Sequence, residues 1–300
     1  MRLGILTFAI VCIPPLAAVS QELTAHEKDV ANAARAIYSD LRATGFQTLS
    51  CAVDFDRHSV PSLPLDPPVV SLLKETRFSL TIDAVGHVSV QHQIPESRDQ
   101  GAWGVAEYMS EKVISRLIQG DWQVWVDRGL SGPIPRSDEF VQSITDTDEG
   151  YVFFLRGPTM PSQLFTDKKF RPTKITFSNG LGEQYDHYVT RAHGLVLSSI
   201  ESIGTTDPSA PTRVTLDFTF SKVGDFELPT SIRMQQDPQP FDTTFSLSRC
   251  TVNGTRVQLP GDRPTTDSQP ANPHPSSASA APAPSTTVSS ARCPAANRHP

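Results

Sequence analysis

The feature that most constrains the fold is an alternation of apolar and polar residues through the second half of the chain. From residue 140 onward, short alternating runs follow one another, separated by clusters of Gly, Pro, Asn or Asp. Because no helical segment interrupts them, their even spacing predicts consecutive antiparallel pairing, a meander, and not a parallel sheet. We expect strands at residues 140–145, 151–156, 174–178, 184–191, 195–203, 213–220, 227–234 and 243–252.

The same alternation predicts a sheet with one apolar and one solvated face. In residues 213–220, for example, Phe218 and Phe220 stand on the apolar side and polar residues lie between them. Apolar residues recur at helical spacing in residues 21–43 and 104–118, with Gly120 as the expected end of the second helix. We therefore expect an α+β fold in which these two helices cover the apolar face.

Shorter elements are expected in the first hundred residues. Residues 48–55 alternate as a strand does, and Asp66 is placed to cap a short helix that begins at Pro67. The runs 77–82 and 87–93 indicate a hairpin.

The first 20 residues are typical of an export signal. A basic residue, Arg2, precedes an apolar stretch that is too short to span a bilayer, and small residues at 18–20 predict cleavage just before Gln21. No later segment is long and apolar enough to cross a membrane. We expect a periplasmic or secreted protein.

The end of the chain has a different composition. Residues 259–300 are rich in Pro, Ser and Ala and lack aromatic side chains, so we expect a disordered tail after a single domain at residues 21–258. With 32 acidic and 26 basic side chains and no basic block, the chain offers nucleic acid no electrostatic attraction.

Two cysteines lie in expected strands. Cys51 belongs to the first strand and Cys250 to the last, and in an oxidising compartment we expect a disulfide between them. The alternative is two buried free thiols. If the disulfide forms, Cys293 in the expected tail stays unpaired.

No motif indicates a catalytic, metal or cofactor site. Asp146 and its acidic neighbours are expected to form a hairpin turn, because their spacing does not fit a calcium loop. Tyr185, Asp186 and His187 are the best candidates for catalysis or metal binding, but in a strand Asp186 faces away from the other two, and half-buried structural residues are the simpler interpretation.

Aromatic side chains are candidates for lining a ligand site between sheet and helices, although aromatic residues at such spacings more often form the core. The candidates are Trp122, Trp125, Phe153, Phe218 and Phe220.

Part of the chain resembles a known family. Three parts of the chain resemble the outer-membrane lipoprotein carrier superfamily: the segment Gly194-Leu195-Val196-Leu197, the strand 213–220 and the run from Gly224 to Ile232, in which Leu228-Pro229 precedes Ile232. The chain is also similar to uncharacterised secreted bacterial proteins that keep one cysteine in the first strand and one in the last. The resemblance implies a strongly curved antiparallel sheet, an incomplete barrel closed over by helices, whose concave face holds an acyl chain or an apolar peptide.

These observations support three hypotheses about function. The first is an exported, non-catalytic protein that binds or carries an apolar ligand, such as an acyl chain or lipid, without a cofactor. The second is a cell-envelope interaction or structural protein that uses its Pro-rich tail as a spacer towards a protein partner. The third is a hydrolase or metal-dependent enzyme around Tyr185, Asp186 and His187.

Overall fold

A computed structural model describes residues 22–56, 65–156, 162–178, 180, 182–204, 211–238 and 241–259. The described residues all belong to one unit of the chain, Met1–Asp262. The expected export signal and the expected tail, apart from the buried Leu259, lie outside the described residues and stay predictions.

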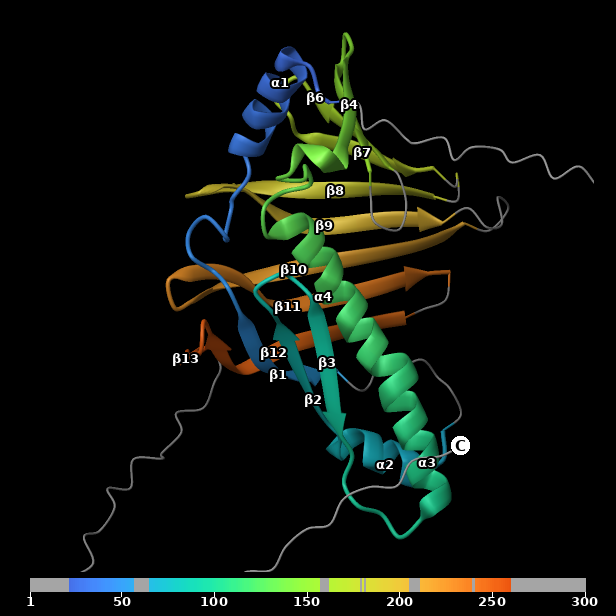
Figure 1. Cartoon of the computed structure of the whole chain (residues 1–300). Helices are drawn as coiled ribbons and strands as arrows, with labels where there is room; N and C mark the ends of the chain where they lie inside the picture. Colours follow the sequence, from blue (N-terminus) through green and yellow to red (C-terminus); the bar gives the residue numbers. More distant parts are fainter. Residues whose placement is uncertain are drawn as a thin grey trace, which may run out of the picture. The chain divides into compact units, whose positions relative to one another are not determined.

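The described part of the chain is built on one open antiparallel sheet of 13 strands, as the alternation predicted (Figure 1). The sheet order is β3-β2-β1-β12-β11-β10-β9-β8-β7-β6-β5-β4, so β4 to β12 pair in sequence order and β1 joins the first strands to the last, while β13 pairs with β12. The strands are β1 (Leu49–Phe55), β2 (Arg77–Ile82), β3 (Val88–Gln93), β4 (Val141–Asp146), β5 (Gly150–Leu155), β6 (Ser162–Asp167), β7 (Pro172–Phe177), β8 (Gly182–Arg191), β9 (Gly194–Gly204), β10 (Thr212–Val223), β11 (Phe226–Asp237), β12 (Phe241–Val252) and β13 (Thr255–Arg256).

The disulfide prediction is confirmed. Cys51 in β1 and Cys250 in β12 are bonded, with their Cα atoms 4.1 Å apart, across two neighbouring strands. The disulfide therefore links β1 to β12 where these two strands pair.

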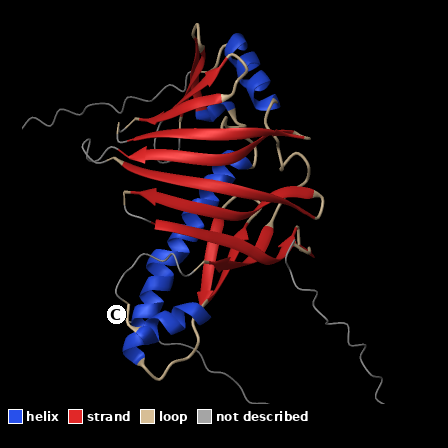
Figure 2. Ribbon diagram, turned by 180° about the vertical axis from the view of Figure 1, so that it is seen from behind, coloured by secondary structure: helices blue, strands red, loops and turns tan. Residues whose placement is uncertain are grey.

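The longest helical segment is a continuous rod from α3 (Gln100–Tyr108) through a π-helical segment (Met109–Ile114) to α4 (Ser115–Gly129). The prediction that a helix ends at Gly120 was wrong. A side chain at that position would meet no atom within 4 Å, so Gly120 lies on an open side of the rod and the helix passes through it. α4 contacts β3, β9 and β2, and Figures 1 and 2, which view the sheet from opposite sides, place it on one face of the sheet.

Helix α1 (Ala25–Ala36) is shorter than the predicted segment 21–43. A capping box between Thr24 and Glu27 starts it, and it ends because the following residues pair with a strand. Ser39 donates its backbone N–H to the carbonyl of Leu195, and the Leu195 N–H bonds the carbonyl of Ile37. Helix α2 (Pro67–Glu75) begins at its predicted proline.

Two separate cores hold the sheet. The larger packs α2, α3 and α4 against β1 to β3 and β9 to β12, and the smaller packs α1 against β4 to β7. Tyr188 of β8 packs against both and forms an edge-to-face contact with Tyr38, with ring centroids 5.0 Å apart. β8 and β9 therefore mark the seam between the cores.

Helix side chains bond the backbone of both edge strands. On β3, Val88 donates its N–H to Gln123 Oε1 at 3.1 Å, and Gln119 donates to the carbonyl of Val88 at 3.0 Å. On β4, the N–H of Ile144 bonds Glu27 Oε1 of α1 at 2.9 Å. Such bonds occupy backbone groups that an open edge would otherwise offer to another strand. Among the described residues, no helix combines the length and the apolar character that crossing a membrane requires.

Candidate functional site

A groove opens at the C-terminal end of α4, beside the seam between the two cores. Its enclosed volume is about 50 Å³, which rises to about 520 Å³ when the open space at its mouth is counted. Leu41, Val196, Phe220 and Phe226 give it an apolar floor, and Gly129, the last residue of α4, also lines it. The enclosed volume is well below the roughly 300–1,000 Å³ of small-molecule sites in proteins, so a ligand of that size would have to widen the groove.

The elements around the groove are fixed by short turns and close backbone contacts. Gly194 begins β9 with a φ of 119°, and a Cβ there would lie 2.8 Å from the carbonyl oxygen of Ile37. Only glycine allows the segment before Leu41 to lie this close to β9. Phe226 is held from behind by an edge-to-face contact with Phe46, with 5.7 Å between the ring centroids.

The end of α4 is anchored on two sides of the groove. The Tyr188 hydroxyl donates to the carbonyl of Arg128 at 3.0 Å, and the N–H of Leu41 donates to the carbonyl of Leu130 at 2.9 Å. These bonds satisfy carbonyls that a helix end leaves without an intrahelical partner. The end of α4 beside the groove is therefore held in place by both β8 and the α1–β1 segment.

Charged side chains form the rim. Arg191 at the end of β8 lies 3.5 Å, Nε to Oε1, from Glu227 at the start of β11, and His193 and Asp225 line the same groove. Because Arg191 and Glu227 are both well exposed, this ion pair contributes little stability. The groove thus has an apolar floor and a rim that carries both signs of charge.

Behind the groove, α4 presents a row of residues spaced four apart: Asp121, Trp125 and Gly129. A Cβ on Gly129 would lie 2.5 Å from Nε1 of Trp125, so the indole occupies the space that a side chain would need. Trp125 is fully buried, and its Nε1 has no hydrogen-bond partner among the described residues.

Asp121 is the buried charged residue of this row. Its side-chain oxygen Oδ2 also finds no partner among the described residues, and burial raises the pKa of its carboxyl group to about 7. A carboxyl group held away from water in this way favours its neutral form.

The structure brings together four of the five predicted aromatic candidates. Trp122, Trp125 and Phe218 are buried in the larger core, and Phe220 packs against that core and lines the groove. Phe153, however, belongs to the smaller core, where it is fully buried. Phe153 therefore lies apart from the groove.

The residues considered for an enzyme site do not converge. Asp186 is buried on the inner face of β8, where Gln184 donates to it at 2.6 Å, and burial raises the pKa of its carboxyl group. His187 is exposed, and the Tyr185 hydroxyl donates to Glu183 at 2.7 Å. Among the residues that the structure describes, no three His, Cys, Asp or Glu side chains lie together as a metal site would require.

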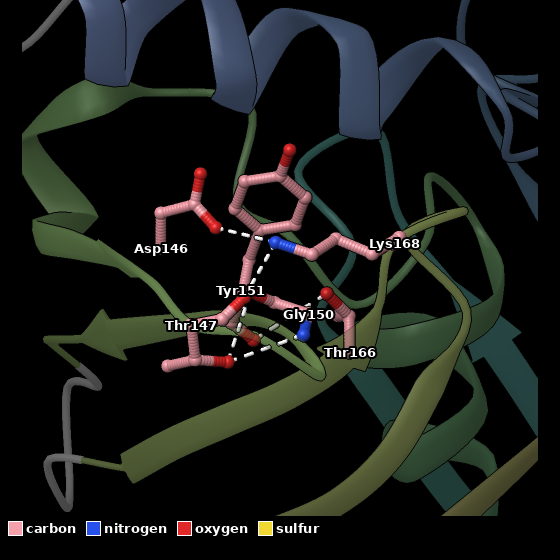
Figure 3. A network of polar contacts seen from close by, with 6 residues as sticks. All are labelled: Asp146, Thr147, Gly150, Tyr151, Thr166 and Lys168. Carbon is pink, nitrogen blue, oxygen red and sulfur yellow. Dashed lines mark hydrogen bonds and ion pairs between the residues drawn. The ribbon is translucent and has the colours of Figure 1, made fainter.

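The acidic cluster around Asp146 is a hairpin turn between β4 and β5, as predicted (Figure 3). The Lys168 ammonium bonds both Asp146 Oδ1, at 2.6 Å, and the carbonyl of Thr147, and lies 5.2 Å from the ring centroid of Tyr151. Gly150 is required in this turn, because a Cβ would lie 1.7 Å from the carbonyl oxygen of Thr166. The cluster is therefore occupied by a lysine of the same chain.

Comparison with known proteins identifies no relative. No known family, no curated protein and no solved structure matches this chain.

Proposed function

We propose that this chain is an exported, non-catalytic protein that binds an aliphatic ligand, entering through the groove at the end of α4. The observation that carries the proposal is the groove itself: its apolar lining includes Gly129, and against Gly129 lies the buried indole of Trp125, whose N–H has no partner among the described residues. A small-molecule site combines an apolar lining with a few polar groups in the same way.

The resemblance to the outer-membrane lipoprotein carriers supports the same proposal. On this view the open sheet is an incomplete barrel, and α3 and α4 cover its concave face. The one-sided burial of the strands agrees with it, since in β12 every second residue from Phe241 to Leu247 is buried. The ligand would then be an acyl chain or a molecule of similar shape.

Side chains fill the space beyond the groove, because Trp122, Trp125 and Ile118 are fully buried against the larger core. A ligand longer than the groove would therefore have to displace them. The π-helical segment before α4 supports such a movement, since π-helical turns interrupt the regular ladder of an α-helix and often lie at functional sites.

The proposal is tested by the quenching of tryptophan fluorescence by a brominated aliphatic chain. The fluorescence of Trp125 should be quenched, and the variant Trp125→Phe should lose most of this quenching. Trp103 lies 22 residues earlier on the same rod, about 33 Å away at 1.5 Å per residue, so Trp103→Phe is the matched control and should keep the effect. Mass spectrometry of extracts from the purified protein should find a co-purified aliphatic molecule. If no chain quenches Trp125 and the extracts hold no such molecule, the proposal is wrong.

A further inference from the structure

We propose that a second, shallow pocket, formed by β4 to β7, binds a neutral saccharide. This pocket lies at the ends of these strands and shares no lining residue with the groove at the end of α4, so the inference goes beyond the proposed function. The enclosed volume of the pocket is about 100 Å³, which rises to about 340 Å³ when the open space at its mouth is counted. A sugar ring bound here would therefore keep one side in solvent.

The register of the strands sets one row of side chains in this pocket. Phe154 of β5 pairs with Gln163 of β6, which pairs with Thr176 of β7, so the three side chains share one face of the sheet. Their neighbours Phe153 and Ile175 point to the opposite face, where they are fully buried in the smaller core with α1. The row, which is partly exposed, therefore lies on the face that α1 leaves open.

A β-bulge in β4 adds a further polar side chain. Val141 pairs with Leu155 and Ser143 pairs with Phe154, so Gln142 is an extra residue in β4. Such a bulge redirects side chains at the end of a strand and often lies next to a functional site. The exposed Gln142 lines the pocket together with Phe154.

The polar side chains of the pocket are neutral and free to bind a ligand. Gln142, Gln163 and Thr176 form no side-chain hydrogen bond with any residue that the structure describes. A carboxamide both donates and accepts hydrogen bonds, and so does a hydroxyl group. Sugar hydroxyls do the same, so they match these three side chains.

The aromatic rings and the absence of charge narrow the class of ligand. Phe154 and Phe177 supply the apolar part of the lining, and the partly negative face of an aromatic ring attracts the C–H groups of a sugar ring. Among the described residues, no charged side chain lines the pocket. Lys174 and Glu183, on the same face, pair with each other at 3.2 Å. A charged ligand would find no counter-ion in the pocket, whereas a neutral saccharide needs none.

The test is an NMR titration of the methyl-labelled, disulfide-bonded protein with three neutral disaccharides: N,N′-diacetylchitobiose, cellobiose and maltose. At least one of them should cause saturable shifts of the methyl signals of Leu155 and Thr176, which line the pocket. The signals of Leu41 and Val196, which line the groove at the end of α4, should not move. Chitobiose, the cationic disaccharide without acetyl groups, is the matched charged probe and should bind more weakly than its neutral form.

Three variants separate recognition from loss of structure. Gln142→Ala removes one carboxamide from an exposed bulge and should weaken binding about tenfold, which corresponds to one hydrogen bond. Phe154→Leu keeps an apolar side chain but removes the ring face, so it should abolish the shifts. Phe165→Leu removes a half-buried ring of the same face that lies outside the pocket, and this matched control should bind with unchanged affinity.

Two results would overturn the inference. One is the absence of saturable shifts at Leu155 and Thr176 with all three neutral disaccharides. The other is unchanged affinity of the Phe154→Leu variant. Either result would leave the proposed function standing, because that function concerns a different groove.

Discussion

The buried carboxyl group of Asp121 makes the stability of this protein depend on pH, and the variant Asp121→Asn removes that dependence. Burial raises the pKa of this carboxyl from 3.8 to about 7. Between these values the folded chain holds a proton that the unfolded chain has lost, so the free energy of unfolding falls as pH rises. A shift of about three pH units at about 1.4 kcal/mol each amounts to about 4 kcal/mol lost by pH 8.

Urea unfolding of the two proteins at several pH values measures this difference. At about pH 4 the neutral acid and the amide are nearly equivalent, and the two free energies of unfolding should agree. At about pH 8 the variant should be more stable by up to about 4 kcal/mol. The buried Asp186 is present in both proteins and cancels in the comparison. Asp29→Asn, on the exposed side of α1, should show no such trend. A difference that stays constant with pH, or a variant that is less stable at pH 8, would refute the reasoning.

Three other perturbations test how the fold is held. Replacing Cys51 and Cys250 by serine should cost about 5 kcal/mol of unfolding free energy, since the bridge closes a loop of 199 residues; an unchanged urea midpoint would contradict this. Gly150→Ala forces a Cβ into the backbone of β6 and should cost about 3 kcal/mol, whereas Gly104→Ala, with nothing within 4 Å, should stabilise α3 by up to about 1 kcal/mol in thermal unfolding. Glu27→Ala removes the half of the capping box in which the Glu27 carboxylate accepts from Thr24, and also the bond to the β4 edge; the cap bond from the backbone N–H of residue 27 to the Thr24 hydroxyl remains. The variant should cost about 1 kcal/mol at pH 7 and progressively less as pH falls through the lowered pKa of Glu27, as urea titrations would reveal.

The strands were predictable because their pattern is local. In β12 and β2, buried and more exposed residues alternate, and this alternation is already visible in the sequence. β6 was missed for a physical reason: its two apolar residues, Leu164 and Phe165, are adjacent and lie on opposite faces of the strand, one fully buried and one half-buried. A strand with apolar side chains on both faces shows no clear alternation of apolar and polar residues in its sequence.

The helix ends could not be predicted because tertiary contacts decide them. α1 stops where Ser39 begins to bond β9, a strand that lies more than 150 residues later in the chain. The rod continues through Gly120 although glycine disfavours a helix by about 1 kcal/mol, because burial of Trp122 and Trp125 outweighs that cost.

Within the candidate site, the sequence indicated the aromatic residues but not the row behind the groove. Phe220 and Trp125 were predicted as ligand-binding candidates, and both lie at the groove or directly behind it. Asp121 and Gly129 were not singled out. The sequence shows that these residues are spaced four apart. It does not show that the carboxyl group of Asp121 is buried, or that the missing side chain of Gly129 leaves space for a neighbour, because both depend on the residues that pack around them.

The position of the groove follows from how the sheet is covered. Twelve strands in one path are too many for a single helix to cover, so α4 packs over one part of the sheet and α1 over another. Between them runs the segment that links α1 to β1, where Tyr38 belongs to the smaller core and Leu41 to the larger. The C-terminal end of α4 reaches this boundary, since α4 contacts β9 and the Arg128 carbonyl accepts from the Tyr188 hydroxyl of β8. The groove, lined there by Ser39 and Val196, and the buried polar pair Gln184 and Asp186 both lie on the elements that meet at this seam. The ligand of the proposed function would enter the protein at this seam, where the groove lies.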